Sequence, residues 1–147
     1  NEKPLKGREF VEVEYLGEEH VVLAFRTAPK HHEDYPTLRL IDMILDNAVA
    51  AVDGNDNGQI TIETSFNKDL KIATLKISDN GCGIPAEDKP RLFEPYFSTK
   101  KSGTGLGLAI VSTIVSDHNG YIRVRDNEPQ GTHFIVELPI TSEVTQT

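Results

Sequence analysis

The sequence predicts an α/β fold, a two-layer α/β sandwich in which helices pack on one face of a single sheet. Two kinds of segment support this prediction. Some alternate apolar and polar residues, as half-buried strands do, and others repeat apolar residues every three or four positions, as amphipathic helices do. Both kinds are interspersed along 147 residues, which is the length of one ordinary domain.

The first quarter of the chain is expected to contribute two strands, at 9–15 and 20–27, which can pair as a hairpin. Residues 28–36 contain two prolines and are typical of a loop. We interpret residues 1–147 as a single domain with a core over 36–139, an N-terminal region over 1–35 and a polar tail over 140–147. Because the chain starts with Asn and opens in a polar stretch, we expect it to be a piece of a longer polypeptide.

The clearest helix is expected to begin near Thr37, just after Pro36, and to end at Asp53, where GNDNG follows. Its apolar residues recur at spacings of three and four, which predicts a stripe that faces the core. The predicted stripe consists of Leu38, Ile41, Leu45, Ala48 and Val52.

Two further strands are predicted at 59–66 and 71–79, joined by a hairpin turn at NKDL. By the two-residue period of a strand, Ala73, Leu75 and Ile77 share one face, and Asp79 ends that row. Residues 86–93 have the composition of a helical turn or two.

A second amphipathic helix is predicted over 105–118, with Gly120 placed to end it. Strands at 121–126 and 132–139 follow. The apolar stripe predicted for the helix consists of Leu106, Ala109, Ile110, Thr113 and Ile114.

Composition excludes several classes of function. The formal net charge is −8, whereas proteins that bind nucleic acid backbones usually concentrate Lys and Arg. No apolar run approaches the roughly 20 residues of a membrane span, so we expect a soluble domain without membrane contact. Cys82 is the only cysteine, which excludes an internal disulfide or a cysteine metal cluster and fits a reducing, cytoplasmic compartment.

A glycine-rich stretch lies directly before the second predicted helix. Gly103, Gly105 and Gly107 let the backbone approach a ligand closely, and the start of a helix presents unpaired N–H groups to an anion. Lys100 and Lys101 add positive charge just upstream. The pattern therefore fits a phosphate-binding loop, although a flexible loop with a glycine-rich cap has the same spacing.

Two polar residues are candidates for contacts with a ligand. Asp79 ends an apolar strand face and precedes a glycine-rich turn, so its carboxylate can accept a hydrogen bond from an exocyclic amine such as that of adenine; the alternative is an ordinary turn acid. Asn47 lies in the middle of a helix, where Asn has poor propensity. It could supply a metal ligand, or it could be a solvated surface residue.

Five motifs together carry a family resemblance. In order, LDNAVAA, DNGCGIP, LFEPYFSTK, GTGLGLAIV and GTHFIVELP resemble the N, G1, F, G2 and G3 boxes of the ATP-binding catalytic domain of bacterial sensor histidine kinases. The resemblance covers about residues 36–139 and looks closest to the nitrogen-regulation group. It implies the Bergerat-type fold of the wider GHKL superfamily, which has a mixed, mostly antiparallel sheet.

The resemblance also implies a role for each matching residue. Asn47 would coordinate a Mg²⁺ ion that bridges the phosphates of ATP, and Asp79 would bind the adenine amino group. Gly81 and Gly83 would shape the adenine pocket, and Thr132 would support its far wall. A mobile lid would be anchored by Phe93 and Phe97, and the rest of the nucleotide-binding stretch would be Lys100, Gly103, Thr104, Gly105, Leu106 and Gly107.

The implied activity is transfer of the γ-phosphoryl group of Mg-ATP to a histidine on a separate dimerisation hairpin, and from there to a response regulator. The implied location is cytoplasmic, whether or not the whole kinase has a membrane anchor. One position departs from the family: many members have Asn where this chain has Met43, and ATP-hydrolysing relatives have Glu. The departure leaves open a nucleotide-binding switch with weak catalysis. A further alternative to the histidine kinase is an anti-sigma-type serine kinase on the same fold.

Overall fold

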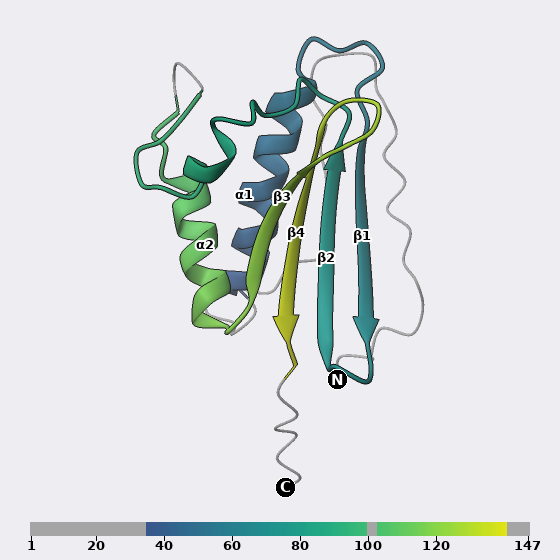
Figure 1. The fold of residues 1–147 in the computed structure, drawn as a ribbon, viewed down its shortest axis with the longest axis vertical. Helices are drawn as coiled ribbons and strands as arrows, with labels where there is room; N and C mark the ends of the chain where they lie inside the picture. The colour runs from purple at the N-terminus through teal and green to yellow at the C-terminus, as the bar shows by residue number, and fades with distance from the viewer. Residues whose placement is uncertain (1–34, 100–102, 141–147) are drawn as a thin grey trace, which may run out of the picture.

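The computed structural model describes residues 35–99 and 103–140 (Figure 1). The predictions made for residues 1–34, for Lys100 and for the tail beyond residue 140 lie outside this part of the chain. Within it, no helix is long and apolar enough to cross a membrane. The elements are α1 (Tyr35–Val52), β1 (Ile60–Asn67), β2 (Ile72–Asp79), the short 3-10 helix η1 (Lys89–Arg91), α2 (Gly107–Asp117), β3 (Tyr121–Asp126) and β4 (Thr132–Pro139).

The four strands form one sheet in the order β1-β2-β4-β3, with every neighbouring pair antiparallel. Figure 1 shows α1 and α2 on one side of this sheet, with their axes running roughly along the strands. The predicted two-layer α/β sandwich is therefore confirmed. Because β2 pairs with β4, the end of β2 at Asp79 lies beside the start of β4 at Thr132.

The core lies between the sheet and the two helices. Ile77, Phe134 and Val136 project from β2 and β4 toward the helices and are almost completely buried. The predicted parity is confirmed for these three residues. In contrast, β1 is exposed along almost its whole length, and both Ser78 and Asp79 are buried at the end of β2. The helices contribute Leu40, Ile44, Leu45, Ala48, Val111 and Val115.

The buried faces of both helices differ from the predicted stripes. In α1, the most buried side chains are those of Leu40, Ile44 and Ala48. Only Ala48 was in the predicted stripe. In α2, Val111 is fully buried, whereas Ile110 is 42% exposed. Both helices have apolar residues on more than one side, so the three- and four-residue spacing alone fits several adjoining stripes.

The ends of the helices also differ slightly from prediction. The first helix starts at Tyr35 rather than Thr37, with Pro36 in its first turn, where the missing N–H of proline costs no helical hydrogen bond. The second starts at Gly107 rather than Gly105. The residue with a left-handed φ after this helix is Asn119, at 55°. The sequence had predicted that Gly120 would end the helix in this way.

Candidate functional site

The candidate site is built around Asp79, the last residue of β2. Its side chain is only 2% exposed, and its Oδ1 accepts a hydrogen bond from the Gly81 backbone N–H at 2.9 Å. Thr132, its partner across the β2–β4 pair, is also 2% exposed. The sequence predicted that these two residues face the core side of the sheet, and the structure places them side by side there.

Burial has an electrostatic consequence for this carboxyl. Loss of solvent raises the pKa of Asp79 above its usual value, although hydrogen bonds from the Gly81 and Thr132 backbones and the charge of His133 act in the opposite direction. A hydrogen bond from a donor stabilises a buried carboxylate more than it stabilises a solvent-exposed carboxylate. Asp79 is therefore suited to recognise a donor group on a ligand.

The loop after Asp79 packs directly on α1. A Cβ atom added to Gly81 would lie 2.2 Å from the Ala51 carbonyl oxygen, so only glycine fits this close approach. The Cys82 N–H donates to the same oxygen at 3.2 Å. Asn47 lies four residues before Ala51, so one turn of helix separates it from the point where the loop touches α1.

Asn47 has a defined orientation on α1. Its half-buried side chain donates from Nδ2 to the Met43 carbonyl oxygen at 2.8 Å. An amide binds a metal through its oxygen, so, with Nδ2 bonded to the helix backbone, Oδ1 is the atom of this side chain that could ligate a metal. The Met43 side chain is half-buried and packs against the core cluster.

The described residues contain no preformed cluster of metal ligands. Within residues 35–99 and 103–140, no group of three or more His, Cys, Asp or Glu side chains is placed to hold a metal ion. Magnesium in nucleotide sites is usually held by one or two protein ligands together with phosphate oxygens and water. A single amide oxygen from Asn47 fits that kind of site.

The predicted lid begins with a well-packed base. The guanidinium of Arg91 lies 4.5 Å from the centroid of the Phe97 ring, and its Nε is 3.3 Å from Glu94 Oε2. Phe93 and Phe97 are both half-buried, and the neighbouring Leu92 is buried. The two phenylalanines therefore lie against the protein at the start of this loop, whereas Gly103 and Thr104 are exposed.

The two ends of this loop are joined where α2 begins. The Tyr96 N–H donates to the Gly105 carbonyl oxygen at 2.9 Å, and a Cβ added to Gly105 would lie 2.5 Å from the Tyr96 carbonyl carbon. Leu106 caps α2 without a side-chain hydrogen bond, and a Cβ added to Gly107 would meet nothing within 4 Å. The first turn of α2 thus has backbone N–H groups that no cap side chain covers.

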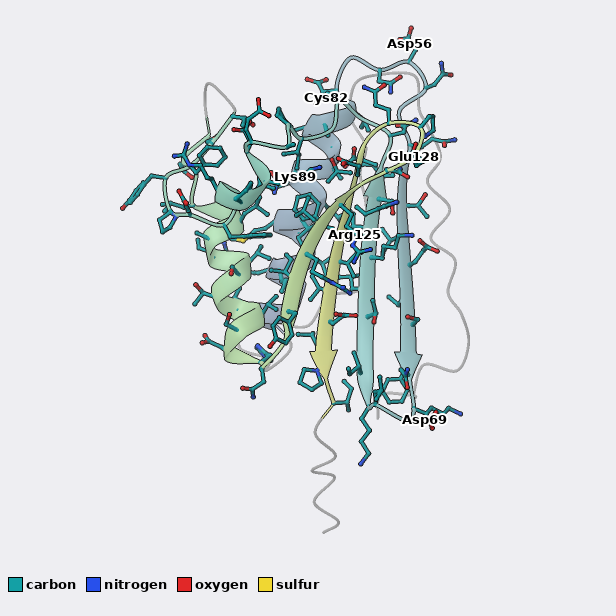
Figure 2. All side chains as sticks on the ribbon, in the orientation of Figure 1. Asp56, Asp69, Cys82, Lys89, Arg125 and Glu128 are labelled. Atoms are coloured by element: carbon teal, nitrogen blue, oxygen red, sulfur yellow. The ribbon has the colours of Figure 1, made fainter. Side chains whose placement is uncertain are left out.

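Several residues around the site were not predicted from the sequence. Asn80 hydrogen-bonds to the segment before β1, and Asn127 donates to the carbonyl oxygen of Asp79. Lys89 Nζ lies 2.6 and 2.7 Å from the two carboxylate oxygens of Asp126, which ties η1 to the end of β3 (Figure 2). Their partners are distant in sequence, so no local pattern could have identified them.

One cavity of about 390 Å³ lies between the Cys82–Pro85 stretch and the turn 126–131 that joins β3 to β4. Among the predicted site residues that the structure describes, only Gly83 lines it. Asp79, Gly81 and Thr132 are brought together at the end of the sheet, with Asn47 nearby on α1. The lid and glycine residues form a second group at the start of α2, at the same end of the molecule (Figure 1).

Comparison with known proteins gives the family. Residues 34–142 match the family described as histidine kinase-, DNA gyrase B-, and HSP90-like ATPase. The signal transduction histidine-protein kinase AtoS of Escherichia coli K12 is 43% identical over 104 residues, which cover 71% of this chain and 17% of AtoS. The nitrogen regulation protein NtrY of Azorhizobium caulinodans is 38% identical over 112 residues, covering 71% of this chain and 14% of NtrY. The chain thus spans only a small part of the length of these relatives.

Solved structures agree with the sequence relatives. The mycobacterial sensor histidine kinase MprB superposes with a TM-score of 0.64 at 31% identity, over 74% of this chain and 75% of that chain. The nucleotide-free catalytic domain of histidine kinase ThkA superposes with a TM-score of 0.64 at 32% identity, over 73% and 68% of the two chains. The resemblance read from the five motifs is confirmed, and the chain belongs to the histidine kinase-, DNA gyrase B- and HSP90-like ATPase family, as a domain of the kind found in sensor histidine kinases.

Proposed function

We propose that residues 1–147 form a single ATP-binding catalytic domain of a two-component sensor histidine kinase. The domain transfers the γ-phosphoryl group of Mg-ATP to a histidine on a separate dimerisation hairpin, from which a response regulator takes it. The observation that carries the proposal is the buried carboxylate of Asp79, next to Gly81 and Thr132, in a chain of this family.

In this proposal, Asp79 accepts a hydrogen bond from the adenine amino group. Gly81 shapes the pocket by letting the loop pack against the Ala51 backbone, Gly83 shapes the next part of the same loop, and Thr132 supports the wall of the pocket. Asn47 Oδ1 would supply the protein ligand of a Mg²⁺ ion bound with the nucleotide, and that ion would neutralise phosphate charge. Adenine recognition thus comes from the sheet, and metal binding comes from α1.

The phosphate groups are assigned to the lid and to the start of α2. Gly103, Thr104, Gly105 and Gly107 present backbone N–H groups, and Lys100 adds a positive charge. Leu106 leads into α2, and its own N–H donates to Thr104 Oγ1 at 3.4 Å. Phe93 and Phe97 anchor the lid, which closes over the nucleotide and excludes water. Because phosphoryl transfer needs mainly positioning and charge neutralisation, these contacts can supply most of the catalysis.

Met43 supports a second candidate, a domain that binds ATP as a conformational switch with little turnover. Its thioether cannot act as a base, and its side chain packs toward the core rather than forming part of a polar shell. A serine kinase on the same fold is a third candidate, which the acceptor chemistry distinguishes. Phosphohistidine is labile in acid and stable in alkali, whereas phosphoserine shows the opposite behaviour.

The test uses the chain together with a dimerisation hairpin supplied separately. We expect Asp79→Asn to weaken ATP binding about tenfold or more, in line with loss of a hydrogen bond to a charged group, while inorganic triphosphate is affected much less. We also expect labelled phosphate to reach the hairpin in an acid-labile form. Equal loss of ATP and triphosphate binding would reject the assignment of Asp79, and binding without any transfer would favour the switch.

A further inference from the structure

Two asparagines outside the proposed contacts hold the Asp79 loop from opposite sides. We propose that Asn80 and Asn127 are positioning residues that fix the backbone around Asp79, so that its carboxylate keeps the place and direction needed to select adenine. Neither side chain is assigned a contact with the nucleotide. The inference rests on the proposed function, because it concerns how the adenine-binding carboxylate is held.

Asn80 connects the loop to the segment between α1 and β1. Its Oδ1 accepts from the Gln59 N–H at 2.7 Å, and its Nδ2 donates to the Asn57 carbonyl oxygen at 2.8 Å. Both ends of the amide are therefore used, and both reach a segment more than twenty residues earlier in the chain. Aspartate could replace only the acceptor of this pair, because a carboxylate has no N–H group.

The segment that Asn80 holds is itself compact and leads directly from α1. The Asn55 N–H donates to the Val52 carbonyl oxygen at 2.9 Å, and Asn55 Oδ1 accepts from the Asn57 N–H at 3.0 Å. Asn80 thus links Asp79 to the end of the helix that carries Asn47. The adenine-binding and metal-binding residues are on different elements, so a link of this kind sets their relative position.

Asn127 holds the loop from the other side. Its Nδ2 donates to the Asp79 carbonyl oxygen at 2.7 Å, and its own N–H donates to the Gly131 carbonyl oxygen at 3.0 Å. Gly131 lies so close that an added Cβ would be 2.0 Å from the same Asp79 oxygen. The turn between β3 and β4 is therefore packed tightly on the backbone of Asp79 and held there by one side chain.

These contacts have a consequence for base selectivity. Adenine offers an amino donor where guanine has a carbonyl oxygen, so a fixed carboxylate attracts the first and repels the second. A carboxylate on a loosened loop can turn away or accept a bridging water, and it then discriminates less. Loss of either asparagine should lower ATP affinity and also reduce the preference for ATP over GTP, which a purely structural role would not change.

The experiment compares the equilibrium affinities of Mg-ATP and Mg-GTP for the native chain, Asn80→Ala and Asn127→Ala. The matched control is Asn67→Ala: Asn67 Oδ1 also accepts two backbone hydrogen bonds, from Asp69 and Leu70 at 3.0 Å each, but in the turn between β1 and β2. In Figure 2 this turn, marked by Asp69, is at the opposite end of the sheet from Cys82 and Glu128.

We expect both site variants to reduce the ratio of ATP to GTP affinity by about tenfold, the scale of one or two lost hydrogen bonds, while Asn67→Ala leaves the ratio unchanged. If Asn80→Ala does not fold, Asn80→Asp takes its place, with a smaller reduction expected. An unchanged ratio in either folded variant overturns the positioning role of that residue. Failure of the native chain to prefer ATP would instead overturn the proposed function.

Discussion

At the scale of single residues, the chain places an ionisable group where burial disfavours its charge. The acid at position 79 could be predicted to face the core side because the two-residue strand period fixes its parity. Its carboxylate accepts a hydrogen bond from the Gly81 N–H, and its backbone carbonyl accepts one from the Asn127 side chain. The bond from Asn127 could not be predicted, because it depends on how loops far apart in sequence meet. The sequence thus predicted on which face of the sheet this carboxyl lies, while the structure shows which groups hold it.

The raised pKa of Asp79 predicts a dependence of stability on pH. The folded chain binds the carboxyl proton more tightly than the unfolded chain, whose Asp pKa is near 3.9. This contribution to stability is present below about pH 3.9 and is lost as pH rises through the higher folded pKa. The side chain of the Asp79→Asn variant does not titrate. The thermal midpoint of this variant minus that of the native chain, both measured without nucleotide, should therefore increase from pH 4 to pH 7. A difference that stays constant or decreases over this range would contradict the prediction.

Met43 allows a second prediction at the residue scale. If an amide at this position normally helps to hold a reacting water, Met43→Asn should leave nucleotide affinity nearly unchanged and raise ATP hydrolysis several-fold. A neutral histidine is already a nucleophile near neutral pH, so transfer to a supplied hairpin should depend less on this position than hydrolysis does. Initial rates of both reactions for native and variant chains provide the measurement. Equal hydrolysis rates would show that position 43 has no such role.

At the scale of elements, the sequence predicted strands better than helix faces. A strand has only two faces, so Ile77 and Phe134 could be assigned to the core without knowing their neighbours. A helix with apolar residues around most of its surface has several possible buried faces. The segment Gly107–Asp117 could bury Ile110 or Val111, and packing against the sheet selects Val111.

The junction between the lid and α2 predicts a contrast between two glycines. Gly105 has φ +69° and no room for a Cβ beside Tyr96, whereas Gly107 has open space. Gly105→Ala should therefore destabilise the nucleotide-free domain by at least about 1–2 kcal/mol. Gly107→Ala should leave its stability unchanged or slightly higher, because Ala favours helix more than Gly does. Urea unfolding of both variants measures this, and equal effects would contradict the proposed junction.

At the scale of the whole molecule, the site draws on elements from both ends of the described chain. The helix α1 carries Asn47, β2 ends in Asp79, β4 begins with Thr132, and α2 begins at Gly107. The sequence could not predict this assembly, because it requires the strand order β1-β2-β4-β3 and a pairing of β2 with a strand far along the chain. The family resemblance implied it, since the five motifs resemble the boxes of a single ATP-binding domain.

If the proposed site joins these elements, nucleotide binding should stabilise the domain as one cooperative unit. A ligand at 100 times its dissociation constant adds about 2.7 kcal/mol to the free energy of unfolding when it binds only the folded state. For a single domain of 147 residues, this raises the thermal midpoint by roughly 5–10 °C. Mg-ADP is the suitable ligand, since it is not consumed during the measurement.

The midpoint should be the same by far-UV circular dichroism and by the fluorescence of the four tyrosines, which report on different parts of a chain without tryptophan. Asn67→Ala should start from a lower midpoint but show the full shift with Mg-ADP, because its turn lies away from the site. Asp79→Asn should show a much smaller shift at the same Mg-ADP concentration. A full shift in Asp79→Asn would mean that ADP is held without the base contact, and two separate transitions in the native chain would mean that the site does not join its elements into one folding unit.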